Sequence, residues 1–329
     1  MNEQKNQATV AENFYDGLLT VTPSPHIKHT ATTTKVMAEV LIALIPAFVW
    51  GVIVFGLNAF LMPAIAVAAS VLFEFLTQKL LKKPVTVGDL SAAVTGLLLG
   101  FNLPASDSYF LPVVGAAFAI VVVKQLFGGI GKNFVNPALA ARVFLFLSWP
   151  DKMAAFPAPF DRAVVDAVAS ATPRSGAAVS LLDLFLGKCG GSIGEISVLL
   201  LLIGGIYLMV RGIITWHIPV AYLGTVALIT LLFPQGGGFF DPSFMLFELC
   251  SGGLVLGAFF MATDYVTSPI TGKGRLIFGV GCGLLTVFLR YFGAYPEGVS
   301  FAILVMNCLV WYIDKLTRPR VFGGARHGQ

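Results

Sequence analysis

The residues of this chain that could do chemistry are few, and the least expected of them lie in the stretch VDAVASATPR. There Asp166 introduces a run of small residues, Ser170 and Ala171 among them, that ends at the hydroxyl of Thr172. By composition alone, serine, threonine and proline in a loop are ordinary turn residues. A single displayed threonine hydroxyl is nevertheless unusual in a chain that is otherwise so apolar.

Three acids form a second group of candidates. Asp89 and Glu248 each begin a short segment rich in small residues, and acids at membrane edges are candidate functional residues. A carboxylate there offers oxygen ligands to sodium or a titratable site for a proton, so both could flank an ion path. The alternative is a helix N-terminal charge stabilised by the helix dipole. Glu74 is expected to pair with Lys79 five residues later.

The other motifs give weaker evidence for a functional site. The glycine clusters GGIGK, GKCGGSIG and GGG do not sit between a strand and a helix, as phosphate-binding loops require, and are interpreted as turns. The four histidines are scattered without metal-ligand spacing. The four cysteines form no CxxC pair, and three lie in apolar segments, which argues against a disulfide framework or a cysteine metal site.

The composition indicates where these residues must be held. Of 329 residues, 57% are hydrophobic and 12% are charged, against about 25% charged in soluble domains. Several apolar runs approach the roughly 18 residues that suggest a bilayer-spanning helix. We therefore expect an all-α polytopic membrane protein.

The apolar runs predict ten transmembrane helices. They cover approximately residues 36–56, 59–81, 86–102, 109–127, 134–149, 196–214, 216–233, 244–263, 275–292 and 298–314.

Lysine and arginine accumulate in short cytoplasmic loops, so they orient the helices. A cytoplasmic N-terminus places fifteen of these residues inside and five outside, with Arg142 within a span. The predicted parts are a cytoplasmic arm (1–35), a first transmembrane repeat (36–149), an extracytoplasmic loop containing Thr172 (150–195), a second repeat (196–314) and a cytoplasmic tail (315–329).

The two halves are similar in sequence order. DLSAAVTGLLLGF aligns with ELCSGGLVLGAFF, and LPVVGAAFAIVVVK aligns with IFGVGCGLLTVFLR. VNPALA then aligns with VSFAIL, and the three offsets are 159, 166 and 164 residues. Because five helices per unit is an odd number, the second unit is expected to be inverted relative to the first. Such repeats are typical of transporters and channels.

Three blocks carry a family resemblance: GGIGKNFVNPALAAR, ATDYVTSPITGKGRLIFGVGCG and YPEGVSFAILVMN. With the order of spans, they resemble the D subunits of Rnf ion-translocating electron-transport complexes, a family shared with the B subunit of the sodium-translocating NADH:quinone reductase. The resemblance covers about residues 25 to 322.

The resemblance implies a covalent FMN, attached through its phosphate by a flavin transferase. In that family the acceptor threonine ends an Asp-x-x-Ser-Gly-Ala-Thr signature. Here Asp166, Ala171 and Thr172 match, whereas Ala169 and Ser170 replace the usual serine and glycine. The spacing from Asp166 to Thr172 is kept, so Thr172 is the expected acceptor.

The resemblance also implies a second, non-covalent flavin, riboflavin. Asn133 and Asn136 are candidate lining residues, because Pro137 can interrupt the helix ladder and free polar backbone for a ligand. The alternative is a simple helix start, with Asn136 as N-cap and Pro137 at the first helical position.

The expected function is that of a membrane subunit in a redox-driven ion pump, with both termini cytoplasmic in the inner membrane. It would relay electrons through FMN while partner subunits, a second covalent-FMN subunit and iron-sulfur subunits among them, hold the ferredoxin and NAD sites. No nucleic-acid partner is expected. The rival hypothesis is a stand-alone channel or secondary transporter without a redox cofactor, since inverted repeats also build permeases.

Overall fold

The computed structural model describes residues 32–106, 108–160, 180–235, 238–293 and 298–319. Within these ranges all regular structure is helical. Four of the predicted site residues, Asp166, Ser170, Ala171 and Thr172, lie outside the described residues. So do residues 1–31 of the predicted arm and residues 320–329 of the predicted tail.

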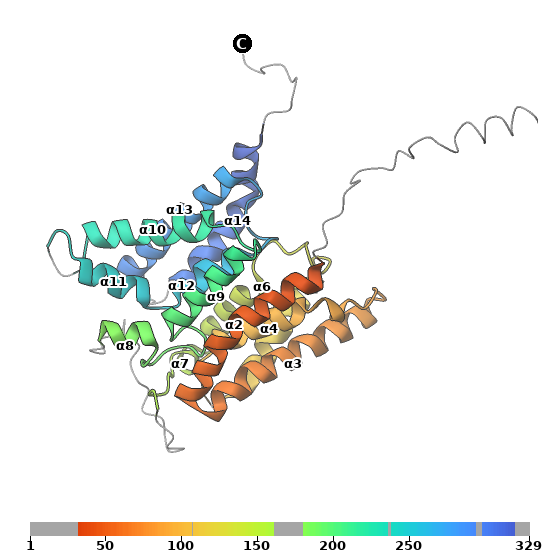
Figure 1. Ribbon diagram of the computed structural model, residues 1–329. Helices are drawn as coiled ribbons and strands as arrows, with labels where there is room; N and C mark the ends of the chain where they lie inside the picture. Colours follow the sequence, from red (N-terminus) through yellow and green to blue (C-terminus); the bar gives the residue numbers. More distant parts are fainter. Residues whose placement is uncertain (1–31, 107, 161–179, 236–237, 294–297, 320–329) are drawn as a thin grey trace, which may run out of the picture. The chain divides into compact units, whose positions relative to one another are not determined.

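The helices follow one another in the order labelled in Figure 1. The first half contains α2 (Thr33–Phe55), α3 (Leu57–Leu80), the 3-10 turn η1 (Val87–Asp89), α4 (Ser91–Phe101), α5 (Phe110–Ala117) with its π-helical continuation η2 (Phe118–Gln125), α6 (Pro137–Ser148) and α7 (Pro150–Met153). The second half contains α8 (Leu181–Leu186), α9 (Val198–Val210), α10 (His217–Leu232), α11 (Pro242–Cys250), α12 (Leu254–Leu256) with its π-helical continuation η4 (Gly257–Met261), α13 (Gly272–Phe292) and α14 (Val299–Thr317).

Each of the ten predicted segments contains helix, but their lengths differ. Four helices of the described chain, α2, α3, α13 and α14, are long and apolar enough to cross a membrane, and the bent pair from α11 to η4 is a fifth candidate. The remaining apolar helices are shorter. The chain is therefore an all-helical, polytopic membrane protein.

The span predicted over 244–263 is not one continuous helix. The axis bends by 65° between α11 and the segment from Leu254 to Met261. At the bend, Gly252 and Gly253 have φ values of 66° and 65°, a left-handed conformation that glycine adopts without steric cost. Average hydropathy does not register such a break, because the flanking residues are equally apolar.

Polar caps fix where several helices begin. The Asn136 side chain accepts hydrogen bonds from the backbone of Ala138 and Leu139 at the start of α6, with Pro137 at the first helical position. Asp241 caps α11 in the same way. The Thr271 hydroxyl accepts from Gly274 at the start of α13. These caps satisfy backbone donors that a helix leaves unpaired at its N-terminus.

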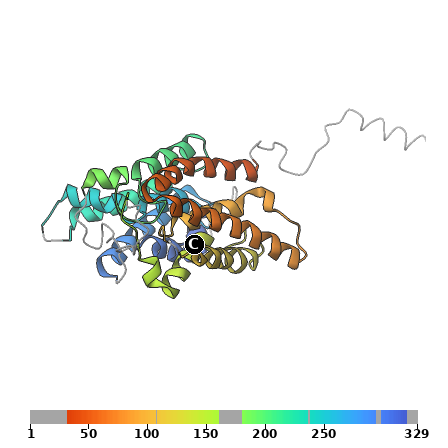
Figure 2. The same ribbon diagram turned by 90° about the horizontal axis from the view of Figure 1, so that it is seen from below.

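Close helix contacts in both halves depend on pairs of glycines four residues apart. In α4, a methyl group at Gly100 would lie 2.5 Å from Cα of Pro63 in α3, and one at Gly96 would lie 2.7 Å from the Ala66 carbonyl oxygen. In α13, a methyl group at Gly279 or Gly283 would lie similarly close to α10. Figure 2 shows the helices of the protein from below. Small residues let apolar helices approach closely, so these glycines hold α3 to α4 and α10 to α13.

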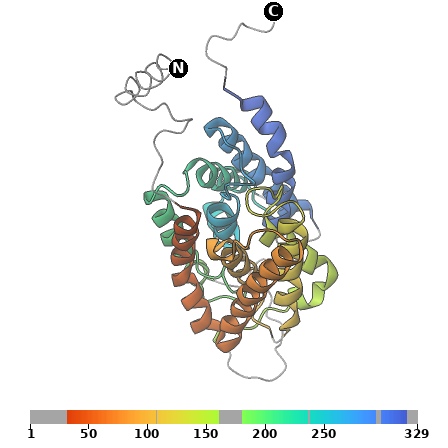
Figure 3. The ribbon, with the colours of Figure 1, turned by 90° about the vertical axis from the view of Figure 1, so that its right-hand side faces the viewer.

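The two halves also contact each other. The first predicted transmembrane helices of the two repeats, α2 and α9, pack together, as Figure 3 shows in red and green, and so do the fifth, α6 and α14. At the end of α4, the Asn102 side-chain amide donates to the sulfur of Met261 at the end of η4, at 3.8 Å. These two residues are 159 positions apart, which equals the first offset of the sequence repeat.

Candidate functional site

A cavity of about 270 Å³ lies where the ends of several helices converge. Its walls come from the first turns of α2 and α4, the end of η2, the loop before α6, the end of α9 and the segment after η4. Asn133, Asn136 and Pro137 all line it. All of these chain ends belong to the face that the charge distribution predicts to be cytoplasmic. The structure therefore brings the three predicted lining residues to one cavity.

Asn136 also caps α6, so the two interpretations of this residue are compatible. Besides its bonds to the first turn of α6, its side-chain amide donates to the Met261 carbonyl oxygen at 3.2 Å. Its backbone amide donates to the side-chain oxygen of Asn307 at 3.2 Å, and Asn307 in turn donates to Thr267. Asn136 thus joins α6 to elements of the second half at the edge of the cavity.

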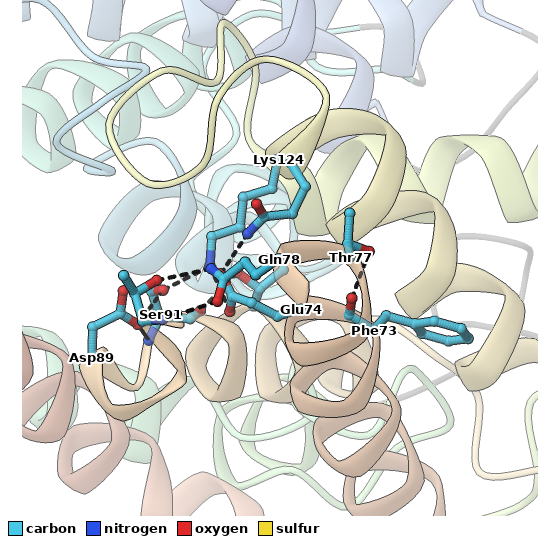
Figure 4. A network of polar contacts seen from close by, with 10 residues as sticks. Phe73, Glu74, Thr77, Gln78, Asp89, Ser91 and Lys124 are labelled. Carbon is cyan, nitrogen blue, oxygen red and sulfur yellow. Dashed lines mark hydrogen bonds and ion pairs between the residues drawn. The ribbon is translucent and has the colours of Figure 1, made fainter. Parts of the chain in front are cut away.

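The polar part of the cavity wall centres on Lys124, near the end of η2. Its side chain is 4% exposed, and its amine lies 2.8 Å from a carboxylate oxygen of Glu74. The same amine donates to the Ser91 hydroxyl at 2.6 Å, as Figure 4 shows. Lys124 and Ser91 line the cavity, whereas Glu74 stands behind them in α3. The expected pair of Glu74 with Lys79 is wrong: the Lys79 amine lies over the Phe75 ring instead.

Glu74 is held by more than one partner. Its side chain is 1% exposed, and Gln125 donates to it at 2.8 Å. Gln78, one turn along α3, donates to the same oxygen at 3.4 Å. Buried carboxylates are tolerated when charge and hydrogen bonds compensate them, and this one has both.

Asp89 contacts the same network from the 3-10 turn before α4. One of its carboxylate oxygens accepts from the backbone amide of Ser91 at 2.8 Å and from the Ser91 hydroxyl at 2.5 Å. The carboxylate therefore stabilises the start of α4, in agreement with the helix-start alternative. Asp89 is partly exposed and is not among the residues that line the cavity.

Glu248 has a different environment from the one predicted. It lies in the last turn of α11, whose start is capped by Asp241, so a helix-start charge is the wrong description. Its carboxylate lies 3.0 Å from the Arg290 guanidinium, and the two side chains are 2% and 0% exposed. Arg290 also donates to the carbonyl oxygens of Glu248 and Ser251, at 2.7 and 2.8 Å. It thereby holds the backbone at the break between α11 and α12.

The burial of Lys124 and Arg290 changes the charge count used for orientation. From the sequence, both were counted on a membrane face at the ends of the predicted spans 109–127 and 275–292, whereas both side chains are buried. Without them fourteen basic residues remain on the predicted inner side and four on the outer side, so the asymmetry persists.

The remaining cavity wall is mostly apolar, with aromatic side chains and one acid. Phe259, Phe260 and Tyr265 line it, together with Asp264 in the segment after η4. Burial raises the pKa of the Asp264 carboxyl, an effect opposed by the Thr267 hydroxyl, which donates to it at 3.0 Å. The positive charge of Lys124, which lines the same cavity, also lowers this pKa. Sequence reasoning missed Lys124 and Asp264 as wall residues.

Arg142 is a further buried charge. Arg142 of α6 donates to the Asn102 side-chain oxygen at 2.7 Å, and its guanidinium is 3.9 Å from a carboxylate oxygen of Glu195. Its position inside an apolar span was visible in the sequence. A charge in such a place indicates a specific partner, but the partners are 40 and 53 residues away and were not predictable.

Within the described ranges, no group of three or more histidine, cysteine, aspartate or glutamate residues is placed to hold a metal ion.

Comparison with known proteins bears on the resemblance found in the sequence. Residues 20–323 match the model of the family described as the NQR2, RnfD, RnfE family. The chain belongs to this family. The predicted resemblance is therefore confirmed.

Individual relatives agree with this membership. The chain is 50% identical to the D subunit of the Na⁺-translocating ferredoxin:NAD⁺ oxidoreductase complex of Acetobacterium woodii, over 93% of this chain and 95% of the relative. It is 40% identical to the D subunit of the proton-translocating ferredoxin:NAD⁺ oxidoreductase complex of Clostridium ljungdahlii, over 97% and 99%. It is 39% identical to the D subunit of the ion-translocating oxidoreductase complex of Stutzerimonas stutzeri, over 91% and 94%.

Proposed function

We propose that this chain is the D subunit of an Rnf-type complex that couples electron transfer between reduced ferredoxin and NAD⁺ to the movement of sodium or protons. The observation that carries the proposal is the 50% identity to a relative so named, over 93% of the chain. The chain acts within the complex and needs partner subunits, because ferredoxin, NAD⁺ and iron-sulfur sites belong to them. A stand-alone permease is disfavoured, since the relatives above are named as subunits of complexes.

The proposed topology is ten helices in two inverted five-helix repeats in the cytoplasmic membrane. Both termini are cytoplasmic, and the loop 150–195 is extracytoplasmic. Support comes from the pairing of α2 with α9 and of α6 with α14, which joins first to first and fifth to fifth helices. The contact of Asn102 with Met261, at the repeat offset, lies where a two-fold relation would place equivalent residues together.

The first proposed cofactor is FMN, linked through its phosphate to Thr172 by a flavin transferase. Support comes from the spacing of Asp166, Ala171 and Thr172, which matches the family signature. A modifying enzyme must approach the backbone closely, and the small residue types in the sequence around Thr172 suit such an approach. On this assignment the FMN lies outside the membrane, on the face opposite the cavity.

The second proposed cofactor is riboflavin, bound without a covalent bond in the cavity. Its volume of about 270 Å³ is near the lower end of ligand pockets, about 300–1,000 Å³. Phe259 and Tyr265 offer aromatic surface for a flat ring, and Asn133 and Ser91 offer polar contacts. Bound there, a flavin accepts and passes on electrons.

The charges of the cavity favour a flavin without phosphate. Lys124 is the cation among the residues that line the cavity, and its amine is already bound to Glu74 and Ser91. Asp264 adds an acid to the wall rather than a second base. A phosphate group is bound most strongly by charge-assisted donors such as arginine or lysine. The wall therefore suits riboflavin better than FMN.

Replacement of the acceptor tests the proposal. With a flavin transferase co-expressed, the wild-type chain should carry flavin that survives denaturation, seen as in-gel fluorescence. Thr172→Ala should abolish this fluorescence while the protein is still inserted and stable. The matched control Ser170→Ala should keep it.

A peptide map locates the modification directly. FMN on Ser170 or Ser175 would show that the acceptor is misassigned. A wild-type chain without in-gel flavin fluorescence, although an active transferase is present, would favour the permease hypothesis instead.

A further inference from the structure

The Lys124–Glu74 pair adjoins the cavity, whereas the Arg290–Glu248 pair does not. Lys124 and its partner Ser91 belong to the cavity wall, whereas Glu74 lies behind them. Neither Glu248 nor Arg290 is among the residues that line the cavity. The first pair therefore contributes its cation to the cavity wall, while its acid is not among the lining residues. Figure 4 shows the contacts of Lys124 with Ser91 and Glu74.

The charged groups bound to the Lys124 amine, directly or through Ser91, are acidic, and a second cation, Lys83, donates to the carbonyl oxygen of the adjacent Gln125 at 3.2 Å. Glu74 contacts its amine, Asp89 reaches it through the Ser91 hydroxyl, and Asp264 lines the same cavity from the segment after η4. The lysine is 3% exposed, so solvent screens its field little. A ligand in the cavity experiences the lysine at closer range than it experiences Glu74.

We propose that the charge of Lys124 raises the reduction potential of the flavin in the cavity, and that the opposite charge of Glu74 reduces this increase. The proposal rests on the proposed function, since it requires a flavin there. Reduction adds negative charge to a flavin, and a nearby cation in a weakly screened site favours the form that carries it. Lys124 therefore raises the potential, and Glu74, by holding the amine and opposing its charge, lowers it.

The two residues thus predict shifts of opposite sign. Lys124→Met removes the cation, and the cavity becomes less positive whether Glu74 keeps its charge or takes up a proton. Glu74→Gln keeps the cation and removes the opposing charge. Damage to the cavity alone would move both variants in the same direction, so the sign separates an electrostatic effect from a structural one.

The experiment uses the full-length chain with Thr172→Ala, so that the visible absorption of bound flavin comes from the non-covalent site alone. The potential of the bound flavin is measured at pH 7 by spectroelectrochemical titration of its visible absorption. Lys124→Met should lower the equilibrium constant for reduction about tenfold, which is 29.6 mV for a two-electron couple. Glu74→Gln should raise it, the double variant should lie between them, and Lys124→Arg should stay near the parent.

The outcomes distinguish a failure of the proposed role of Lys124 from a failure of the proposed flavin site on which it rests. Absence of releasable flavin in the parent chain would contradict the proposed cavity site itself. Flavin that stays bound, with unchanged potentials or with shifts of the same sign in Lys124→Met and Glu74→Gln, would overturn the role of Lys124. Loss of flavin from every variant, Lys124→Arg included, would likewise overturn it, because the lysine would then only shape the cavity.

Discussion

The two halves of the molecule each bury an acid with a base, but they use the pair differently. In the first half, Lys124 and Glu74 stand beside a cavity, with Ser91 and Gln125 as further partners. In the second half, Arg290 and Glu248 lie at the break between α11 and α12, away from that cavity. Lys124 and Arg290 are aligned in the sequence repeat. One position in a duplicated pattern can therefore serve a ligand site in one copy and a backbone break in the other.

The largest difference between the two pairs should appear in stability. Arg290→Met leaves the Glu248 carboxylate buried without its cation, and breaking a buried pair costs about 3–5 kcal/mol. We expect a smaller loss for Lys124→Met, because the cavity can admit water and two glutamines remain near Glu74. Chemical unfolding in mixed micelles measures both.

The double variant Glu248→Gln/Arg290→Met is the control for that comparison. It removes both charges, so it should recover part of the stability lost in Arg290→Met. Equal losses in Arg290→Met and Lys124→Met would show that the cavity makes no difference to the first pair.

The predicted ion path gives a second contrast between the halves. An ion-path role of Asp89 predicts that Asp89→Asn reduces ion transport by the assembled complex while flavin content stays intact, whereas its role at the helix start predicts only a stability loss of roughly 0.5–2 kcal/mol. Glu248→Gln should act mainly through the amount of folded complex, because its carboxylate is committed to Arg290. Transport into vesicles, normalised to flavin, measures the difference. Unchanged transport in both single variants and in the double variant would remove both acids from the path.

The smallest perturbation tests the orientation of the halves. Single cysteines at positions 175 and 324, replacing Ser175 and Gly324 in a chain without its native cysteines, should leave folding unchanged. On intact cells, an impermeant thiol reagent should label position 175 and spare position 324. The reverse pattern would overturn the topology, and with it the side on which the FMN is proposed to lie.

Much of the helical arrangement was accessible from sequence, because it depends on local composition. Apolar runs located helix in all ten segments, and Asn136 followed by Pro137 predicted the start of α6. The lengths of α4 and α6 and the break at Gly252 and Gly253 were missed, because hydropathy averages over the backbone geometry that ends a helix.

The site was less accessible, because its contacts join distant parts of the chain. Lys79 is five residues from Glu74 and was the natural partner by sequence, yet Lys124, 50 residues away, takes that place. Asn133 and Asn136 were found because a family resemblance pointed to them. Lys124 was counted as a charge on a membrane face, and Asp264 had no periodic or motif signal of its own.

The short length of α4 has a consequence for how the protein is made. Its 11 residues extend about 16 Å, roughly half of a 30 Å hydrocarbon core. Such a segment leaves backbone groups at one end that lipid cannot satisfy, so it does not qualify as an independent insertion unit during biogenesis. The contacts of Gly96 and Gly100 with α3 supply the missing partner. We therefore expect α3 and α4 to enter the bilayer together as a hairpin, so that the glycine contacts are needed already during insertion.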